Sequence, residues 1–184
     1  MNRLNLVSGS VDRELGAIRR TIATFEAISA LEDVIGVLRA YSERGNDVEI
    51  VDAIGHSRRH GFLVLGTWVL DDSPQTAATF SLLLRPSLKR LGVHTIRLLG
   101  CSTATTERGC NAMRKIARVT GCEVLGTKRY VSEQDYGDVG LISEHAIVDA
   151  EGRGRSAAIE SSSSRAPRVD KIIRLRSEIR ARST

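Results

Sequence analysis

Two residues that can do chemistry, His56 and Cys101, each stand where an apolar run of the chain ends. One run covers residues 48–55 and the other covers residues 94–100. Continuous apolar stretches of this length are typical of buried parallel strands. Ligands of open α/β sheets bind beyond the carboxyl ends of the strands, so we expect the imidazole and the thiol to share one site. The spacing therefore predicts a hydrolase with a Cys-His dyad.

The residues beside Cys101 are consistent with acyl transfer. A thiol is a nucleophile as the thiolate, and a neighbouring imidazole lowers its pKa and returns a proton to the leaving group. We expect Cys101 to lie between Gly100 and the first turn of a helix, where backbone amides favour negative charge. Gly100 would let a substrate carbonyl approach the backbone, and the amides around Cys101 and Ser102 would form an oxyanion hole.

Cysteine and histidine residues at such positions can also have purely structural roles. Cysteine is often buried, and Cys110 and Cys122 lie inside patterns of a helix and a strand, so both are interpreted as core residues. For Cys101, a buried structural role is the alternative to its role as nucleophile. A single histidine at a strand end is more often a surface residue, and His60, four positions after His56, is the second choice for the base.

A phosphatase is a weaker alternative for Cys101. A cysteine at a strand end before a Gly/Ser/Thr loop also describes a phosphate cradle, but that chemistry needs an arginine six positions after the cysteine. Position 107 is Glu and the arginine is Arg108, so the spacing is wrong by one residue.

Strands and helices alternate along the chain, which predicts a mostly parallel sheet covered on both faces by helices. Residues 21–26 are interpreted as a strand, although Leu15, Ile18, Ile22 and Phe25 also fit a helix. The other expected elements are strands at 4–7, 48–54, 94–99 and 122–126, helices at 30–43, 74–91 (kinked at Pro86) and 105–119, and hairpins at 61–70 and 140–149.

The net charge of +5 belongs to the end of the chain. From Glu151 onward there are nine basic and four acidic residues, so the rest of the sequence is neutral. We predict three parts: an α/β domain over 1–150, a linker rich in Gly, Ser and Arg over 151–168, and a basic amphipathic helix over 169–184. That helix is a candidate for contact with a protein partner or an anionic surface.

Composition excludes several classes of protein. No apolar stretch reaches the roughly 20 residues of a membrane span and no signal peptide is evident, so we expect a soluble, cytoplasmic protein without a transmembrane segment. Three cysteines without zinc spacing argue against disulfides and against a metal, and no cofactor is expected. Aromatic residues make up 4% of the chain and none interleave with the basic tail, so nucleic acid is an unlikely partner.

Three segments resemble the caspase-like cysteine peptidases. These are Ile54-Gly-His-Ser-Arg-Arg-His-Gly-Phe-Leu-Val-Leu-Gly66, Leu98-Leu-Gly-Cys-Ser-Thr-Ala104 and Thr120-Gly-Cys-Glu-Val-Leu-Gly126. They are most similar to the bacterial caspase-like domain found near the start of large cadherin-type adhesins. The resemblance implies a three-layer caspase-haemoglobinase sandwich, with His56 as general base, Cys101 as nucleophile and a polypeptide as substrate.

The sequence departs from that family at both catalytic positions. Ser57 follows His56 where the peptidases commonly have glycine, and Cys101 lies in Leu-Gly-Cys-Ser-Thr. The alternative is therefore a catalytically inactive module of the same fold that binds a partner through its basic tail. For an active enzyme, two sets of residues are candidates for substrate specificity. Arg58, Arg59 and His60 would bind an acidic substrate residue, whereas Glu133, Asp135 and Asp138 would bind a basic one.

Overall fold

A six-stranded sheet forms the centre of the protein. The computed structural model describes residues 2–10, 12–58 and 62–154. The strand order is β11-β8-β7-β3-β1-β2; every pair is parallel except β8 with β11. The predicted α/β fold with a mostly parallel sheet is confirmed. The strands are β1 (Arg3–Ser8), β2 (Glu26–Ile28), β3 (Ile50–Ile54), β7 (Thr95–Leu99), β8 (Glu123–Thr127) and β11 (Ile147–Val148).

The chain changes direction across the sheet at β1. It leaves β1 to form β2 on one side and then returns to pair β3 on the other side, after which β7 and β8 follow outward. This is the flavodoxin-like order with an antiparallel edge strand added, and its switch point is the crevice between the carboxyl ends of β1 and β3.

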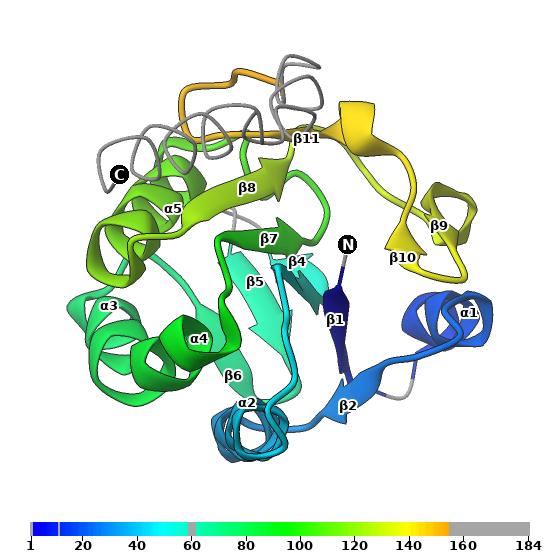
Figure 1. Cartoon of the computed structure of the whole chain (residues 1–184). Coiled ribbons are helices and arrows are strands. Elements are labelled where there is room, and N and C mark those ends of the chain that lie inside the picture. The colour runs from blue at the N-terminus through cyan, green and yellow to red at the C-terminus, as the bar shows by residue number, and fades with distance from the viewer. Residues whose placement is uncertain (1, 11, 59–61, 155–184) are drawn as a thin grey trace, which may run out of the picture.

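Helices cover both faces of the sheet (Figure 1). Because side chains alternate along a strand, Leu6, Ala53 and Leu98 face one way, toward α2, α4 and α5, whereas Val7, Ile54 and Leu99 face α1. The second face is completed by the segment that follows β8. The helices are α1 (Arg13–Thr21), α2 (Leu31–Glu43), α3 (Pro74–Thr79), α4 (Arg85–Leu91) and α5 (Glu107–Thr120).

The strand expected over residues 21–26 is wrong. Asp12 caps a helix by accepting the Leu15 N–H at 2.9 Å, and α1 then runs to Thr21 with Leu15 and Ile18 buried. Leu15 and Ile18 thus follow the helical alternative, whereas Ile22 caps the end of α1 and Phe25 lies beyond it. An N-cap and a period of three to four residues outweigh the short alternation that follows them. The second strand is only Glu26–Ile28.

The predicted kink at Pro86 takes the form of a π-helical turn. Proline has no N–H to donate and its ring crowds the carbonyl four residues earlier, so the chain widens from Phe80 to Leu84. The Arg85 N–H there bonds to the Phe80 carbonyl, five residues back, and α4 then continues to Gly92, which closes it at φ 79°.

A three-stranded antiparallel sheet follows β3, which confirms the hairpin expected over 61–70. It consists of β4 (His56–Arg58), β5 (Phe62–Leu65) and β6 (Trp68–Leu70). Its turn at Gly66 has φ 59°, and a Cβ there would lie 2.0 Å from the Ser29 carbonyl oxygen. The Gly66 N–H donates to Ser8 Oγ at 2.9 Å and the Thr67 N–H to Ser29 at 2.8 Å, so this turn is fixed against β1 and β2.

The single hairpin expected over 140–149 is wrong. The chain forms a two-residue pairing of β9 (Tyr136–Gly137) with β10 (Gly140–Leu141), and β11 pairs with β8 of the main sheet instead. Two 3-10 turns, Glu133–Asp135 and Glu144–Ala146, connect these short strands. The edge position of β8 favours this pairing because it satisfies backbone groups that would otherwise face solvent.

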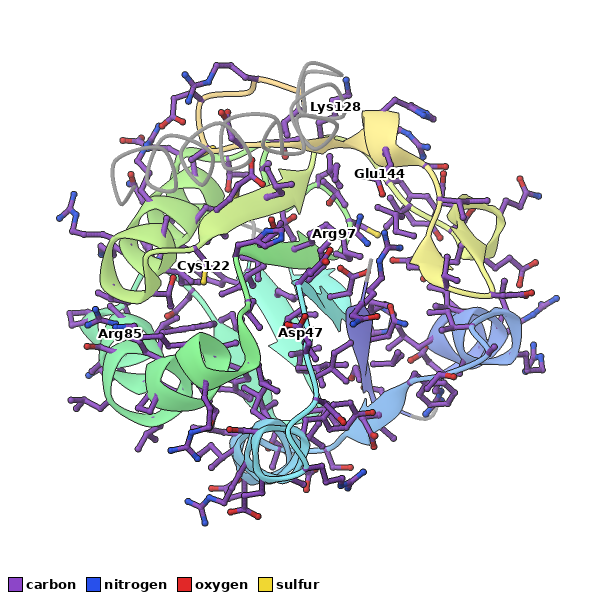
Figure 2. All side chains as sticks on the ribbon, in the orientation of Figure 1. Asp47, Arg85, Arg97, Cys122, Lys128 and Glu144 are labelled. Carbon is purple, nitrogen blue, oxygen red and sulfur yellow. The ribbon has the colours of Figure 1, made fainter. Side chains whose placement is uncertain are left out.

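An ion pair lies inside the sheet, at positions that the sequence analysis treated only as parts of apolar runs. Asp52 of β3 and Arg97 of β7 are in register, and the side chains of both are 0% exposed. The guanidinium donates Nε to Asp52 Oδ1 at 2.5 Å and Nη1 to Glu144 at 2.8 Å (Figure 2). Arg3 of β1 extends the cluster, 3.5 Å from Glu144. These charges hold the segment after β8 on the sheet.

Beyond the predicted domain boundary near residue 150, the chain is described only up to Gly154. Gly154 bridges to Val148, and Arg153 forms an ion pair with Asp149 at 2.6 Å, so the first residues of the predicted linker return to the sheet. The rest of the linker over 151–168 and the helix over 169–184 lie outside the described residues. Within residues 2–154, as far as they are described, no helix is long and apolar enough to cross a membrane.

Candidate functional site

The carboxyl ends of β1, β3 and β7 meet at one edge of the sheet. Val7 pairs with Ile54, and Ile54 pairs with Leu99. His56 and Cys101 each lie two residues beyond these paired positions, and the Gly55 N–H extends the pairing by donating to the Leu99 carbonyl at 3.1 Å. The backbone of the two residues thus leaves neighbouring strands at the same level.

His56 has a carboxylate partner that the sequence analysis did not identify. Its Nε2 lies 2.9 Å from Oδ2 of Asp12. The side chain of His56 is 41% exposed and that of Asp12 is 31% exposed. Asp12 follows β1 and His56 follows β3, so the pair spans the switch point of the sheet. A carboxylate in this position fixes the ring orientation and the tautomer of a histidine base.

Two interactions hold the Asp12 carboxylate in its charged form. Partial burial on its own raises the pKa of Asp12, but the Leu15 N–H and the His56 imidazole outweigh it and keep the pKa below its ordinary value. The same side chain therefore starts α1 and positions the imidazole. An aspartate before a helical stripe is a readable N-cap signal, whereas its contact with His56 depends on tertiary structure.

Cys101 does not lie at a helix N-terminus, so this expectation is wrong. Residues 101–104 form a turn, and α5 begins only at Glu107, where Thr106 is the cap. Cys101 is half-buried, and this burial raises the pKa of its thiol. The Glu14 carboxylate raises the pKa further, whereas a hydrogen bond from the Val131 backbone opposes it. The resting sulfur is accordingly a thiol.

Gly100 packs closely against the hairpin that begins at His56. A Cβ at this position would lie 2.7 Å from Leu63 Cδ1 and 2.9 Å from Ser57 Oγ, so the hairpin fills the space beside it. The carbonyl of Gly100 accepts a short hydrogen bond from the Thr127 hydroxyl. Gly100 therefore fixes the hairpin that begins at His56 close to the turn that begins at Cys101.

The backbone amide of Ser102 is already used. Ser102 adopts φ 59°, and its N–H donates to the Arg129 carbonyl at 3.1 Å. A role in an oxyanion hole would require this bond to break. Thr103 and Thr127 stabilise the same turn, because Thr103 Oγ1 donates to Leu98 at 2.7 Å and accepts from the Thr127 N–H at 2.8 Å.

Glu14 and Tyr130 lie beside Cys101, and neither is predicted from the sequence. The Tyr130 hydroxyl, on a side chain that is 57% exposed, donates a short hydrogen bond to Glu14. This bond, together with burial and the charges of Glu14 and Cys101, raises the pKa of Tyr130 to about 12. Both residues line an open groove of about 480 Å³ between α1 and residues 130–134.

The residues proposed for specificity are only partly placed. The Arg58 backbone pairs with Phe62 in the hairpin, and Arg59 and His60 lie outside the described residues. Asp135 is 7% exposed and its carboxylate binds Arg129 at 2.5 Å, so it is not available to a substrate. Glu133 lines the groove beside Tyr130, and Asp138 is exposed.

The other candidate residues have structural surroundings. Cys122 is 7% exposed and directs Sγ to the Val93 carbonyl at 3.3 Å, which fits the predicted core role. Cys110 is half-buried near the Ala104 carbonyl. Among residues 2–154, where described, no group of three or more His, Cys, Asp and Glu side chains is arranged to hold a metal ion.

His56 and Cys101 share an edge but are not joined by a hydrogen bond within the described part of the chain. The arrangement supplies a thiol, an imidazole and a carboxylate that orients the imidazole, which are the group types of nucleophilic catalysis. Geometry in an unliganded protein is often looser than in the reacting complex. Searches of family models, curated proteins and solved structures give no match to this chain.

Proposed function

We propose that the protein is a caspase-like cysteine hydrolase whose substrate is a polypeptide. The observation that carries this proposal is the 2.9 Å pair of His56 and Asp12 at the switch point, with Cys101 at the same level on the adjacent strand. The α/β sheet and the hairpin that begins at His56 are compatible with the sandwich of that family.

The proposed reaction follows from these groups. Asp12 binds Nε2 of His56, which leaves Nδ1 to accept the proton of the Cys101 thiol as the sulfur attacks the carbonyl carbon. The imidazolium then protonates the leaving amine as the peptide bond breaks, and water hydrolyses the resulting thioester with His56 again acting as base. Asp12 stabilises the imidazolium at each stage because its carboxylate stays charged.

Catalysis of this kind has to overcome two features of the resting site. The pKa of the Cys101 thiol is raised, first by burial and also by Glu14, and the Ser102 amide donates to Arg129. A substrate that displaces the Tyr130–Glu14 pair and the segment at Arg129 would remove the contribution of Glu14 to that pKa and free the Ser102 amide. The proposed enzyme is therefore latent until its substrate binds.

The same two features favour a second candidate, a catalytically inactive interaction module of this fold. In that case Cys101 is a half-buried thiol in a fixed turn, and the groove beside α1 binds a partner without reaction. The two candidates differ in one measurable property, which is whether His56 activates the sulfur of Cys101.

The test is labelling of the full chain by peptide acyloxymethyl ketones that carry either Arg or Asp next to the reactive group. We expect covalent modification at Cys101, located by mass spectrometry, with loss of labelling in Cys101→Ala and His56→Ala and slower labelling in Asp12→Asn. Cys110→Ser is the matched control and should label as the native protein does. Equal labelling of the native protein and His56→Ala, or labelling of Cys110 alone, would establish the inactive module instead.

A further inference from the structure

A second surface, remote from Cys101, combines exposed leucines with unpaired cations. It lies on the outer side of the π-helical turn and α4, where Leu82 is 73% exposed and Leu83 is 49% exposed. We call it the basic leucine patch, and it consists of the exposed residues Leu82, Leu83, Arg85, Pro86, Lys89 and Arg90.

The helical period explains why the leucines face outward. Phe80, Leu84, Leu88 and Leu91 supply the buried side of this helical segment at a spacing of three to four residues. Leu82 and Leu83 lie between these positions, within the π-helical turn, and so face away from that side. π-turns of this kind are frequent at functional sites, and exposed leucines on adjacent positions are unusual in a helix whose core side is complete.

The charge of the patch is one-sided. The sequence from Ser73 to Thr106 contains no Asp or Glu. Arg85, Lys89 and Arg90 take part in no ion pair within the described residues, and Arg85 points outward at the edge of the molecule in Figure 2. The nearby carboxylate of Asp47 lies beyond the end of α4, beside Gly92. Cations on the outer side of a helix with exposed leucines are typical of surfaces that lie on a lipid bilayer.

We propose that the basic leucine patch docks the folded domain onto an anionic lipid bilayer. Leu82 and Leu83 protrude from a helix rather than line a groove, which suits insertion at the headgroup boundary better than binding of a helical peptide. Arg85, Lys89 and Arg90 would then lie at the level of the lipid phosphates, where each basic side chain adds to the attraction. This assigns surface contact to the folded domain, in addition to any contribution from the basic residues after Arg168.

The test is sedimentation of the full chain with vesicles of phosphatidylcholine alone or with phosphatidylserine added. We expect binding to the anionic vesicles only, with a partition coefficient about tenfold or more lower in Leu82→Ser/Leu83→Ser, because both inserted side chains are removed. Arg85→Glu/Lys89→Glu should also lower the partition coefficient and leave only the binding that the basic residues after Arg168 contribute. Added salt should reduce the remaining vesicle binding of the leucine variant to a greater extent than it reduces the binding of the native chain.

The matched control is Val139→Ser/Ile142→Ser, which changes an equally exposed apolar pair on another part of the protein. It should bind as the native chain does. The proposal is overturned if the native chain does not bind anionic vesicles, or if it binds them no better than the leucine and arginine variants do. Any membrane contact would then come from the basic tail alone, or the partner would be a protein.

Discussion

Arg97 and Asp52 face each other across the pairing of β3 with β7, and neither side chain is exposed to solvent. Because side chains alternate along a strand, a slip of one residue would move Asp52 to the opposite, apolar face and separate it from Arg97. The pair therefore specifies the register of the two strands that end at His56 and Cys101.

Asp52→Ala should destabilise the protein by about 3 to 5 kcal/mol, because it leaves the buried Arg97 charge with only the partly exposed Glu144 as a partner. Replacing both residues, as Asp52→Leu/Arg97→Met, should recover most of that loss. Urea unfolding monitored by circular dichroism measures both variants. The control is Glu144→Gln, whose side chain is 44% exposed and should have a much smaller effect. Equal stability of Asp52→Ala and the native protein would show that the buried pair contributes nothing.

Glu14→Gln should lower the pKa of the Cys101 thiol. Burial raises that pKa first and the Glu14 carboxylate adds to it, so removal of the negative charge favours the thiolate. The alkylation rate at pH 7 should increase by about two- to tenfold, measured with iodoacetamide in a Cys110→Ser background. Glu133→Gln changes a carboxylate of the same groove and serves as the control. A rate unchanged by Glu14→Gln would exclude this carboxylate from control of the thiol.

Asp135→Asn should destabilise the protein at neutral pH but not in acid. The Arg129 guanidinium holds the pKa of Asp135 well below its usual range, against the effect of burial. A carboxyl group whose folded pKa is lowered stabilises the protein above its unfolded pKa near 3.9, and this is lost as pH falls toward the folded value. We expect a loss of about 1 to 2 kcal/mol at pH 7 that declines below pH 4. Asp138→Asn, at an exposed position, should show no such pH dependence.

Gly66→Ala should be far more damaging than Gly45→Ala. Both glycines have positive φ, but a Cβ at Gly66 would meet the Ser29 carbonyl whereas nothing lies within 4 Å of a Cβ at Gly45. We expect about 1 kcal/mol for Gly45→Ala from backbone strain alone and about 3 kcal/mol or more for Gly66→Ala. Thermal unfolding of the two variants gives the comparison, and equal losses would show that the backbone at Ser29 moves freely.

The order of strands and helices was predictable because apolar runs, Pro74, Gly92 and Gly121 mark their limits. The first helix was predicted only as an alternative, because its apolar stripe continues into residues 21–26, whose alternation favoured a strand. The relation of Asp12 to His56 had no local signal, since 43 residues separate them and only the parallel pairing of β1 with β3 brings them together. Single charges within two apolar strands, as at Asp52 and Arg97, were a readable sign of a buried pair.

The surroundings of Cys101 show the limit of spacing arguments. Its position after β7 followed from the sequence, but the protonation state of its sulfur depends on Glu14 and on the segment after β8, which arrive from distant parts of the chain. Five residues, 102–106, also separate Cys101 from the start of α5 and from the helix dipole that the sequence suggested.

The close fit of Gly66 against Ser29 constrains how this part of the protein can evolve. The hairpin that starts at His56 is anchored at its distal turn to the junction between β2 and α2, so two regions that contain no reactive group determine where the imidazole is held. Evolution of this edge of the sheet is thereby constrained from a distance: substitutions at the anchor would move the His56 imidazole while His56, Asp12 and Cys101 stay the same.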